Sequence, residues 1–435
     1  MRLLIISHAI NMDGRAASQT VTDKIPYFQS AGFELTVVSA VTGERSQLYK
    51  HVQVLPLTPV ALRFDLRHHF RKVFAQGTWQ YRFTSLAATL VLGVPLLIER
   101  LINRVESQTS WATPAFLVAW WLHRQRRFDV VLSSGGAMSA HVAGYWLKKY
   151  SQLPWVAEIH DPLVYPEWDK SNAQLRLSQW LEERICTVAD AAVWFTQRAR
   201  DRALERYPQL VGRGHVVYAG VDRPQRLVKT ATLQSAEPHF VFAHFGSLSR
   251  TRSLRVFLEG LGKHLESHPG DRPLIRVEIY GGSLDTDSMT FIRGCGLEDV
   301  VTQIGRLERD EETGQSGRDR VLQRMTEVKC LLLLHGQQPV CEEYIPSKLY
   351  EYLWMGPVVL GAVWNNPELE SILLAQGHIA VRSDDVPGYS RSIASLMNDW
   401  KKGHRASGPR VSPYTAARSA QKLIEITRST VRAST

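Results

Sequence analysis

The sequence is poor in cysteine and lacks a long apolar run at its start, and both shortages argue against particular classes of protein. Only four of the 435 residues are cysteines, and no two of them are spaced as Cys-x-x-Cys (Cys186, Cys295, Cys330 and Cys341). Such spacing indicates neither a disulfide framework nor a zinc site. The apolar residues 3–6 are soon followed by His8 and Asn11, and no small-residue cleavage site comes after them. We therefore expect a buried first strand instead of a signal peptide.

Glycine is missing where a dinucleotide-binding enzyme needs it. The first predicted strand-to-helix loop, residues 7–18, contains Gly14 alone, whereas the fingerprint requires glycine at three set positions. This argues against a nicotinamide enzyme. Gly14 still lets a backbone N–H approach an anion, and Arg15 adds positive charge there; the alternative is an ordinary tight turn. Because Pro26 interrupts the helical pattern behind this loop, we expect a kink near Thr22.

Acidic residues are scarce in one segment. The chain has 52 Lys and Arg against 42 Asp and Glu, a surplus of 10. Residues 61–128 alone contain three acidic residues and ten basic ones, a surplus of 7 (Arg63, Arg67, Arg71, Lys72, Arg82, Arg100, Arg104, Arg124, Arg126 and Arg127). Most of the excess positive charge therefore belongs to one segment, which we interpret as an insertion over about residues 60–127.

The same insertion is apolar. Residues 83–98 carry no charge but are shorter than the roughly 20 residues of a bilayer span, and they include Gly93 and Pro95. This favours a helix that lies on a membrane or enters it in part, so residues 61–127 predict peripheral attachment to an anionic membrane surface. A helical insertion packed on its domain with a solvated basic face is the alternative. Nucleic-acid binding ranks third, because no RNA- or DNA-binding module accompanies the charge.

Two series of apolar runs alternate with helical patterns, which predicts two parallel sheets covered by helices in an α/β protein. With 44% hydrophobic residues, the chain is long enough for two packed domains. The predicted strands of the first series are 3–7, 35–39, 130–133, 155–159, 191–195 and 215–218. Those of the second series are 240–245, 274–280, 300–304, 329–334, 358–361 and 378–381. The polar stretch between them predicts domains over residues 1–225 and 237–412.

The most informative segment, residues 341–360, places two carboxylates and a lysine around one helix start. Pro346 suits a first helical turn and Gly356 precedes a proline and a strand, so a helix is predicted over residues 346–355. Glu343 then precedes the helix, while Lys348 and Glu351 lie within it. Free N–H groups and Lys348 attract phosphate, and carboxylates accept hydrogen bonds from hydroxyls, which suits a sugar nucleotide. The alternative is a set of solvated or locally paired charges.

Two further segments carry candidate site residues at the ends of predicted strands. His160 and Asp161 follow the strand at 155–159; they suit a contact with a sugar hydroxyl, or a turn built by Asp-Pro. In the second half, Arg250 and Arg252 are two residues apart in a loop and can reach one anion, unless the loop is merely solvated. The Asp-x-Asp at residues 285–287 is most simply a helix N-cap rather than a metal site.

The string PSKLYEYL at residues 346–353, with Glu343 before it and Gly356-Pro357-Val358 after it, resembles the E-x7-E element of the family 4 retaining glycosyltransferases (glycosyl transferases group 1). This resemblance implies the GT-B fold, two Rossmann-like domains that face each other across a cleft, with residues 413–435 returning to the N-terminal domain. It implies a metal-independent, hexosyltransferase-type enzyme that moves a sugar from a nucleotide sugar to a hydroxyl of a lipid-linked or polysaccharide acceptor. No cofactor and no nucleic acid are expected.

The resemblance also implies a role for each candidate residue. Glu343 and His160 would contact the donor sugar at the catalytic centre, with Asp161 orienting the histidine or facing the acceptor. Glu351 would hold the ribose. The diphosphate would be bound by Gly14, Arg15, Arg250, Arg252, Ser347 and Lys348. The family has an arginine where this chain has Ser247, and Arg250 is expected to compensate.

The expected setting is polysaccharide biosynthesis for the cell envelope, in the cytoplasm and peripheral at the inner face of the cell membrane. Two alternatives stay open. One is a non-catalytic binding or scaffold protein of the same fold, suggested by Ser247. The other is a sugar-nucleotide epimerase of that fold, which would need further groups around the sugar carbon and would release product without an acceptor.

Overall fold

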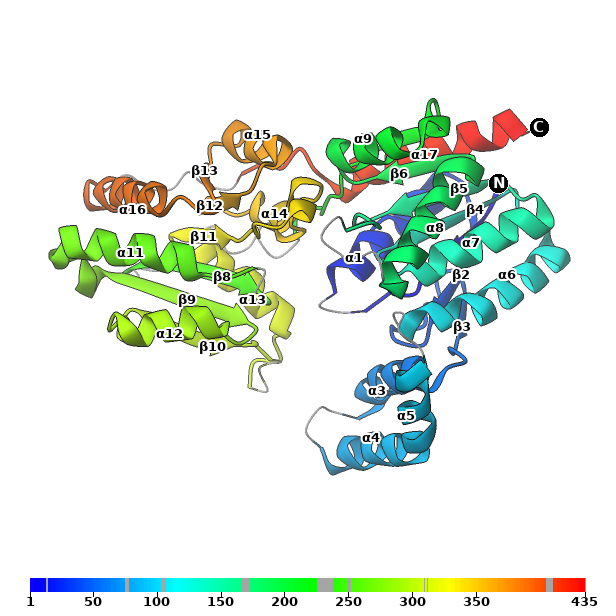
Figure 1. Ribbon diagram of the computed structural model, residues 1–435, viewed down its shortest axis with the longest axis horizontal. Helices are drawn as coiled ribbons and strands as arrows, with labels where there is room; N and C mark the ends of the chain where they lie inside the picture. The colour runs from blue at the N-terminus through cyan, green and yellow to red at the C-terminus, as the bar shows by residue number, and fades with distance from the viewer. Residues whose placement is uncertain are drawn as a thin grey trace. The chain divides into compact units, whose positions relative to one another are not determined.

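The computed structural model describes the chain except residues 13–14, 75–77, 103–106, 166–171, 225–237, 249–251, 309, 311, 404–409 and 435. The chain forms two compact units (Figure 1). Unit 1 contains Met1–Gly220 and Ala416–Thr435, and unit 2 contains Val221–Thr415. Gly14 and Arg250, two of the predicted phosphate-binding residues, lie outside the described residues.

Unit 1 is built on a parallel sheet of seven strands in the order β3-β2-β1-β4-β5-β6-β7. The strands are β1 (Arg2–Ile6), β2 (Glu34–Ala40), β3 (Lys50–Val54), β4 (Val130–Gly135), β5 (Trp155–Ile159), β6 (Ala191–Trp194) and β7 (Gly214–Val216). All six predicted strands of the first series are confirmed within two residues at either end. β3 was not predicted, because this edge strand reads Lys-His-Val-Gln-Val and buries only part of its length.

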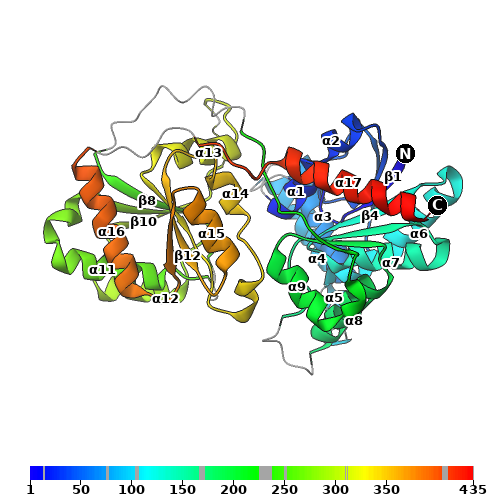
Figure 2. The same cartoon turned by 90° about the horizontal axis from the view of Figure 1, so that it is seen from above.

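Helices cover both faces of this sheet (Figure 2). They are α1 (Ala16–Thr22), α2 (Ile25–Ser30), α6 (Ala112–Arg126), α7 (Met138–Ser151), α8 (Ala173–Val188), α9 (Gln197–Arg206) and α17 (Ala416–Ser434). Alternate residues of β1 join different cores: Leu4 packs with α6 and α7, while Leu3 packs with α2 and α17. The expected kink near Thr22 is confirmed, since α1 ends at that residue and α2 begins at Ile25.

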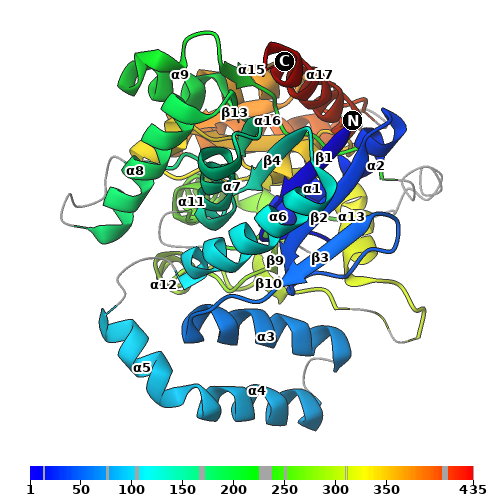
Figure 3. The same ribbon diagram turned by 90° about the vertical axis from the view of Figure 1, so that its right-hand side faces the viewer.

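The insertion of unit 1 is helical and lies between β3 and α6. It consists of α3 (Pro59–Val73), α4 (Trp79–Val91), α5 (Gly93–Ile102) and the 3-10 turn Ser107–Trp111. The three helices lie together, with α3 nearest the sheet of unit 1 (Figure 3). Trp111 closes the insertion by donating its indole N–H to the Val54 carbonyl at 3.0 Å.

A buried pair ties α3 to the end of β1. Asp65 of α3 is fully buried, and its Oδ1 lies 3.6 Å from Nε2 of the buried His8. Neither Asp65 oxygen has a hydrogen-bond partner among the described residues. Burial raises the pKa of Asp65 to about 7. Burial, with help from Arg15 and His68, lowers the pKa of His8 to about 4, so both groups are neutral between these values.

We expect Asp65→Asn to become more stable than the parent chain as the pH rises. The raised pKa means that folded Asp65 keeps a proton which the unfolded carboxyl, with a pKa of 3.8, releases. Its contribution to stability is therefore complete below pH 3.8 and is lost as the pH rises to about 7. The difference in the free energy of unfolding should reach up to about 4 kcal/mol above pH 7.

Melting temperatures of both chains from pH 4 to 8 test this, with Glu183→Gln on the surface of α8 as an acid-to-amide control. Because burial lowers the pKa of His8 to about 4, the part of the comparison above pH 5 follows the ionisation of Asp65. A difference that stays constant over this range would show that Asp65 is ionised throughout.

Unit 2 is built on a parallel sheet of six strands in the order β10-β9-β8-β11-β12-β13. The strands are β8 (Phe240–Gly246), β9 (Ile275–Gly281), β10 (Val301–Gly305), β11 (Cys330–Leu333), β12 (Val358–Val363) and β13 (Ile379–Arg382). The helices are α11 (Arg255–Ser267), α12 (Thr286–Gly294), α13 (Gly317–Glu327), α14 (Lys348–Tyr352), α15 (Pro367–Ala375) and α16 (Val386–Lys401). The predicted strands of the second series are all confirmed within two residues.

The helix predicted over residues 346–355 is wrong in extent. α14 has only five residues, with Pro346 before its start. On both sides the chain turns through tighter bonds: the Leu349 N–H donates to the Pro346 carbonyl at 2.9 Å, and the Trp354 N–H to the Glu351 carbonyl at 3.1 Å. So short a helix supplies little dipole, so the phosphate binding that the sequence predicts here would rest on side chains.

Candidate functional site

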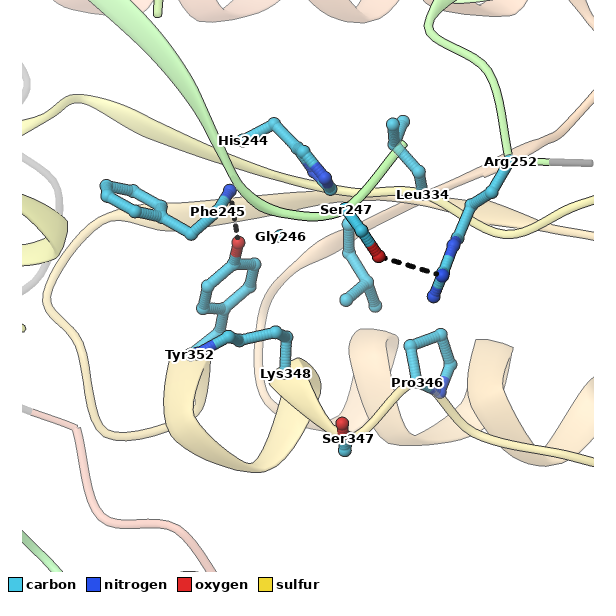
Figure 4. Close-up of a pocket in the computed structure, with 11 residues that line it drawn as sticks. His244, Phe245, Gly246, Ser247, Arg252, Leu334, Pro346, Ser347, Lys348 and Tyr352 are labelled. Carbon is cyan, nitrogen blue, oxygen red and sulfur yellow. Dashed lines mark hydrogen bonds between the residues drawn. The ribbon is translucent and has the colours of Figure 1, made fainter. Parts of the chain in front are cut away.

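Unit 2 contains an open pocket with an empty volume of about 340 Å³ where β8 and β11 end (Figure 4). Its polar lining comes from the end of β8, the loop after it, and the start of α14: His244, Ser247, Arg252, Ser347 and Lys348. Carboxyl ends of parallel strands are where such sheets bind ligands. The structure thus gathers three predicted site residues, Arg252, Ser347 and Lys348, in one place.

Paired glycines shape this edge of the sheet. β8 ends at Gly246, with φ at 156°, and β9 ends at Gly281, with φ at 106°. A Cβ at Gly281 would lie 2.7 Å from the Gly246 carbonyl oxygen, closer than any side chain tolerates. The two backbones can therefore approach and place Ser247 directly beyond the strand.

Two cations enter the pocket from different elements. Arg252 donates from Nη2 to the Ser247 hydroxyl at 3.4 Å. Lys348, at the start of α14, places Nζ 2.7 Å from Oε2 of Glu351. Figure 4 shows Arg252 beside Ser247 and Pro346, with Lys348 on the other side of the pocket. Ser247, which stands where the family has an arginine, thus holds a neighbouring arginine in the pocket.

Glu351 is buried and ionised between two cations. Its Oε2 pairs with Lys348, and its Oε1 lies 3.3 Å from Nη2 of Arg318 on α13. Burial acts to raise the pKa of this carboxyl, but Lys348 and Arg318 outweigh it and lower the pKa below its ordinary value. A buried carboxylate of this kind is a strong acceptor for hydroxyl groups. No pattern in the sequence indicated Arg318, which is 33 residues away from Glu351.

His244 is a pocket residue that the sequence analysis missed. Its ring is buried, and Nδ1 lies 3.1 Å from the Leu332 carbonyl. Burial, with Arg252 and Lys348 nearby, lowers the pKa of His244 to about 4, so the ring is neutral and Nδ1–H is the donor. Nε2 is left as an acceptor with no hydrogen-bond partner among the described residues. A histidine inside the apolar strand Phe-Val-Phe-Ala-His-Phe-Gly was the available signal.

Glu343 is buried in the turn after the 3-10 segment Pro339–Glu342 and does not line the pocket. Asn366 fixes this turn, because its side-chain amide donates to the carbonyls of Cys341 at 3.0 Å and Tyr344 at 2.9 Å. At the other end of the segment, the Tyr352 hydroxyl accepts the Phe245 N–H at 3.2 Å. The segment that carries both glutamates is therefore anchored to unit 2 on either side.

In unit 1, His160 belongs to a buried polar network at the end of β5. Its Nε2 lies 3.1 Å from the Ser134 hydroxyl and 3.5 Å from Oε2 of Glu158, and its ring stacks on Phe195 at 4.4 Å. Glu158 accepts hydrogen bonds from Lys24 and Ser134 as well. Nδ1 of His160 is buried without a hydrogen-bond partner among the described residues. Glu158, Lys24 and Ser134 thus hold His160, and sequence reasoning found none of them.

The network is charged at its centre. Burial acts to raise the pKa of Glu158, but Lys24 and His160 outweigh it and hold the pKa far below its ordinary value. Glu158 and Lys24 are each almost completely buried. Asp161, the predicted partner of His160, is exposed, and its Oδ2 would lie 2.9 Å from a Cβ at Gly136.

Arg15 contacts the insertion: its guanidinium carbon lies 5.4 Å from the centre of the Phe64 ring on α3. The Asp-x-Asp element caps a helix as expected, because Asp285 accepts the Ser288 N–H at 3.0 Å at the start of α12. In the part of the chain that the structure describes, no three His, Cys, Asp or Glu side chains gather as a metal site.

The architecture is similar to that of solved GT-B proteins. Sucrose-phosphate synthase from Thermosynechococcus elongatus superposes with a TM-score of 0.60 at 11% identity, covering 100% of this chain and 97% of that one. TarM of S. aureus, in a complex with UDP, gives 0.58 at 9%, covering 99% and 98%. A putative UDP-N-acetylglucosamine 2-epimerase from Listeria monocytogenes gives 0.50 at 11%, covering 99% and 97%.

These likenesses confirm the predicted GT-B fold, with two Rossmann-like parallel sheets and a helical insertion in unit 1. At such low identity they establish the fold and carry no reaction to this chain. No protein-family model matches the sequence, and no curated protein matches it. Membership of the family 4 glycosyltransferases stays a prediction.

Proposed function

We propose that this protein is a retaining glycosyltransferase that transfers a sugar from a nucleoside diphosphate donor to a hydroxyl of a lipid-linked or polysaccharide acceptor. The observation that carries the proposal is the pocket of unit 2, where Arg252 and Lys348 meet two serine hydroxyls beside the ionised Glu351. Cations and hydroxyl donors at strand ends suit a diphosphate, and the carboxylate suits a ribose.

The chemistry asked of these residues is electrostatic. As the bond between sugar and phosphate breaks, negative charge grows on the departing diphosphate. Arg252 and Lys348 stabilise that charge where other glycosyltransferases use a metal, so the proposed reaction is metal-independent. The phosphate oxygen then takes the acceptor's proton on the same face of the sugar, and the configuration is retained.

The proposal gives the remaining residues binding roles. Glu343 accepts hydrogen bonds from hydroxyls of the donor sugar. His160 contacts the reacting sugar through Nδ1, which is buried and has no hydrogen-bond partner among the described residues. Ser347 and Arg15 contribute to the diphosphate site, and Asp161, being exposed, faces the acceptor.

We further propose that the acceptor is a precursor of a cell-envelope polysaccharide and that the protein acts at the inner face of the cell membrane, from the cytoplasm. This part of the proposal is supported by the insertion of unit 1, which is rich in basic residues and exposes large apolar side chains.

The donor site is tested by thermal shift with uridine, guanosine and adenosine diphosphates and their sugars, with and without EDTA. We expect one nucleotide to raise the melting temperature, with no effect of EDTA. Glu351→Ala should lose this shift because the ribose acceptor is gone, whereas Glu370→Ala, on the surface of α15, should keep it.

Each of the other possible outcomes would overturn one part of the proposed function. No shift with any nucleotide would favour a non-catalytic protein of the same fold. A shift abolished by EDTA would refute metal independence. Isomerisation of the donor sugar without an acceptor would identify an epimerase, a reaction named for one protein of similar fold.

A further inference from the structure

The two outer helices of the insertion expose continuous apolar stripes. In α4, Trp79, Phe83, Leu86 and Leu90 are spaced by four, three and four residues, so they share one helix face. They are 58–72% exposed. In α5, Val94, Leu97 and Leu101 form a second such face, each at least 63% exposed. Exposed apolar surface of this extent marks a binding site. We call these residues, with Val91 and Ile98, the apolar stripe.

Two polar side chains of α4, Tyr81 and Thr89, are hydrogen-bonded to α3. The Tyr81 hydroxyl accepts hydrogen bonds from Nε of Arg67 at 3.1 Å and of Arg71 at 3.2 Å. Thr89 accepts one from Nε of Arg63 at 2.9 Å. Three arginines of α3 thus link this helix to α4. α3 therefore lies between α4, which its arginines contact, and His8 at the end of β1, which its Asp65 contacts.

Among the described residues of α3, α4 and α5, no fully exposed carboxylate lies near the stripe. Residues 59–102 contain only two acidic residues, Asp65 and Glu99. Asp65 is buried, and Glu99 accepts the Val60 N–H at 2.7 Å at the start of α3. Arg82, beside Phe83, is exposed. The surface is therefore apolar with positive charge at its edge, which is complementary to an anionic lipid surface and poorly suited to an acidic or strongly polar partner.

The geometry of the two helices fits one leaflet of a bilayer. α4 has 13 residues and α5 has 10, each well below the roughly 20 residues of a span. No single helix in the described part of the chain is long and apolar enough to cross a membrane, but Trp79–Val91 and Gly93–Glu99 pass together as a pair bent by 60°. Leu90, Val91 and Val94 surround the bend and are all exposed, and residues 83–98 carry no charge.

We propose that α4 and α5 dock this protein on anionic phospholipid membranes by entering one leaflet as a bent pair. The bend, with Leu90, Val91 and Val94, lies deepest. Trp79 and Arg82 lie at the headgroup level, where tryptophan and basic side chains are most stable. α3 stays outside the lipid and carries the anchor on unit 1. This docking stands independently of the glycosyl-transfer proposal, because it requires neither donor nor acceptor.

Flotation of the full chain with vesicles tests the proposal, with no nucleotide present. The vesicles contain phosphatidylcholine alone or phosphatidylcholine with phosphatidylglycerol, at low and high salt. We expect binding to the anionic vesicles that weakens but persists at high salt. Leu90→Ser with Val94→Ser should lower the partition coefficient at least about tenfold, because two apolar side chains leave the hydrocarbon.

A matched control is Leu374→Ser with Val211→Ser, which replaces an exposed Leu and an exposed Val outside the insertion (55% and 71% exposed) and should bind as the parent does. All four positions are exposed, so equal melting temperatures are expected and verify folding. The proposal is overturned if the parent never floats, or if the Leu90 and Val94 variant floats as well as the parent. It is also overturned if the lipid-free parent is a dimer and the Leu90 and Val94 variant is a monomer, since the stripe would then bind a second copy of the chain.

Discussion

Replacing Arg252 and Lys348 together by alanine is expected to weaken nucleoside diphosphate binding at least about a hundredfold. Each cation offers one or more charge-assisted hydrogen bonds to an anion, and each such bond contributes about 1.5–3 kcal/mol. The pocket wall loses both charges, while Ser247 and Ser347 can offer hydroxyls only. Titration calorimetry with the diphosphate that best stabilises the parent chain measures the loss.

The two single variants are expected to differ in how their nucleotide affinity depends on pH. Arg252→Lys keeps the charge but loses the fork that reaches Ser247 and an anion together, so it should bind weakly. Lys348→Ala also removes one of the two cations beside Glu351. Because Lys348 helps to lower the pKa of Glu351, the affinity of this variant should fall further as the pH drops, whereas that of Arg252→Lys should not.

A charge-matched control keeps the interpretation specific. Arg293→Ala with Lys402→Ala removes the same two charges from exposed positions of unit 2 outside the pocket. If this control loses as much affinity as the pocket variant, general charge attracts the nucleotide. If the pocket variant binds as the parent does, the diphosphate lies elsewhere and the proposed donor site is wrong.

The sheets were predictable because their signal is local. Buried parallel strands are continuous apolar runs, and each run that was predicted as a strand is a strand of one of the two sheets. β3 escaped because an edge strand is half solvated and can carry Lys50 and Gln53. The length of α14 was misjudged for a related reason: Pro346 and Gly356 mark where an ordered turn-helix-turn begins and ends, and the helix occupies only its centre.

The partners of the site residues could not be predicted, because they join distant parts of the chain. Arg318 reaches Glu351 across 33 residues, and Lys24 reaches Glu158 across 134. Each partner lies in a helical or loop segment whose residue pattern is the same as that of a solvent-exposed segment. A strand end nevertheless located Arg252, since the carboxyl edge of a parallel sheet collects such residues whatever their partners are. The predicted helix start at Pro346 located Lys348.

Glu158→Ala is expected to cost unit 1 about 3–5 kcal/mol of stability, the usual effect of breaking a buried ion pair. Lys24 would keep a buried ammonium without its carboxylate, and Ser134 and His160 would each lose an acceptor. Thermal unfolding followed by near-ultraviolet circular dichroism measures the change. Glu183→Ala, at a position of α8 whose side chain is 45% exposed, should melt as the parent does.

The pH dependence gives this prediction a sign. The pKa of Glu158 is lower in the folded chain than the 4.5 of the unfolded one. Its contribution to stability is therefore present above pH 4.5 and is lost as the pH falls toward the folded value. The parent should lose stability below pH 4.5 more steeply than Glu158→Ala, and the two melting temperatures should converge in acid. Curves that remain parallel would show that Glu158 is not ionised in the folded state.

A double replacement separates folding from positioning. Lys24→Met with Glu158→Leu removes both charges and keeps the volume, and such exchanges of a buried pair by apolar residues are often neutral or stabilising. Melting should thus recover, while His160 still lacks the carboxylate beside Nε2. If transferase activity stays low in this stable variant, the network positions His160 for the reaction. If activity recovers with stability, Glu158 and Lys24 serve the fold alone.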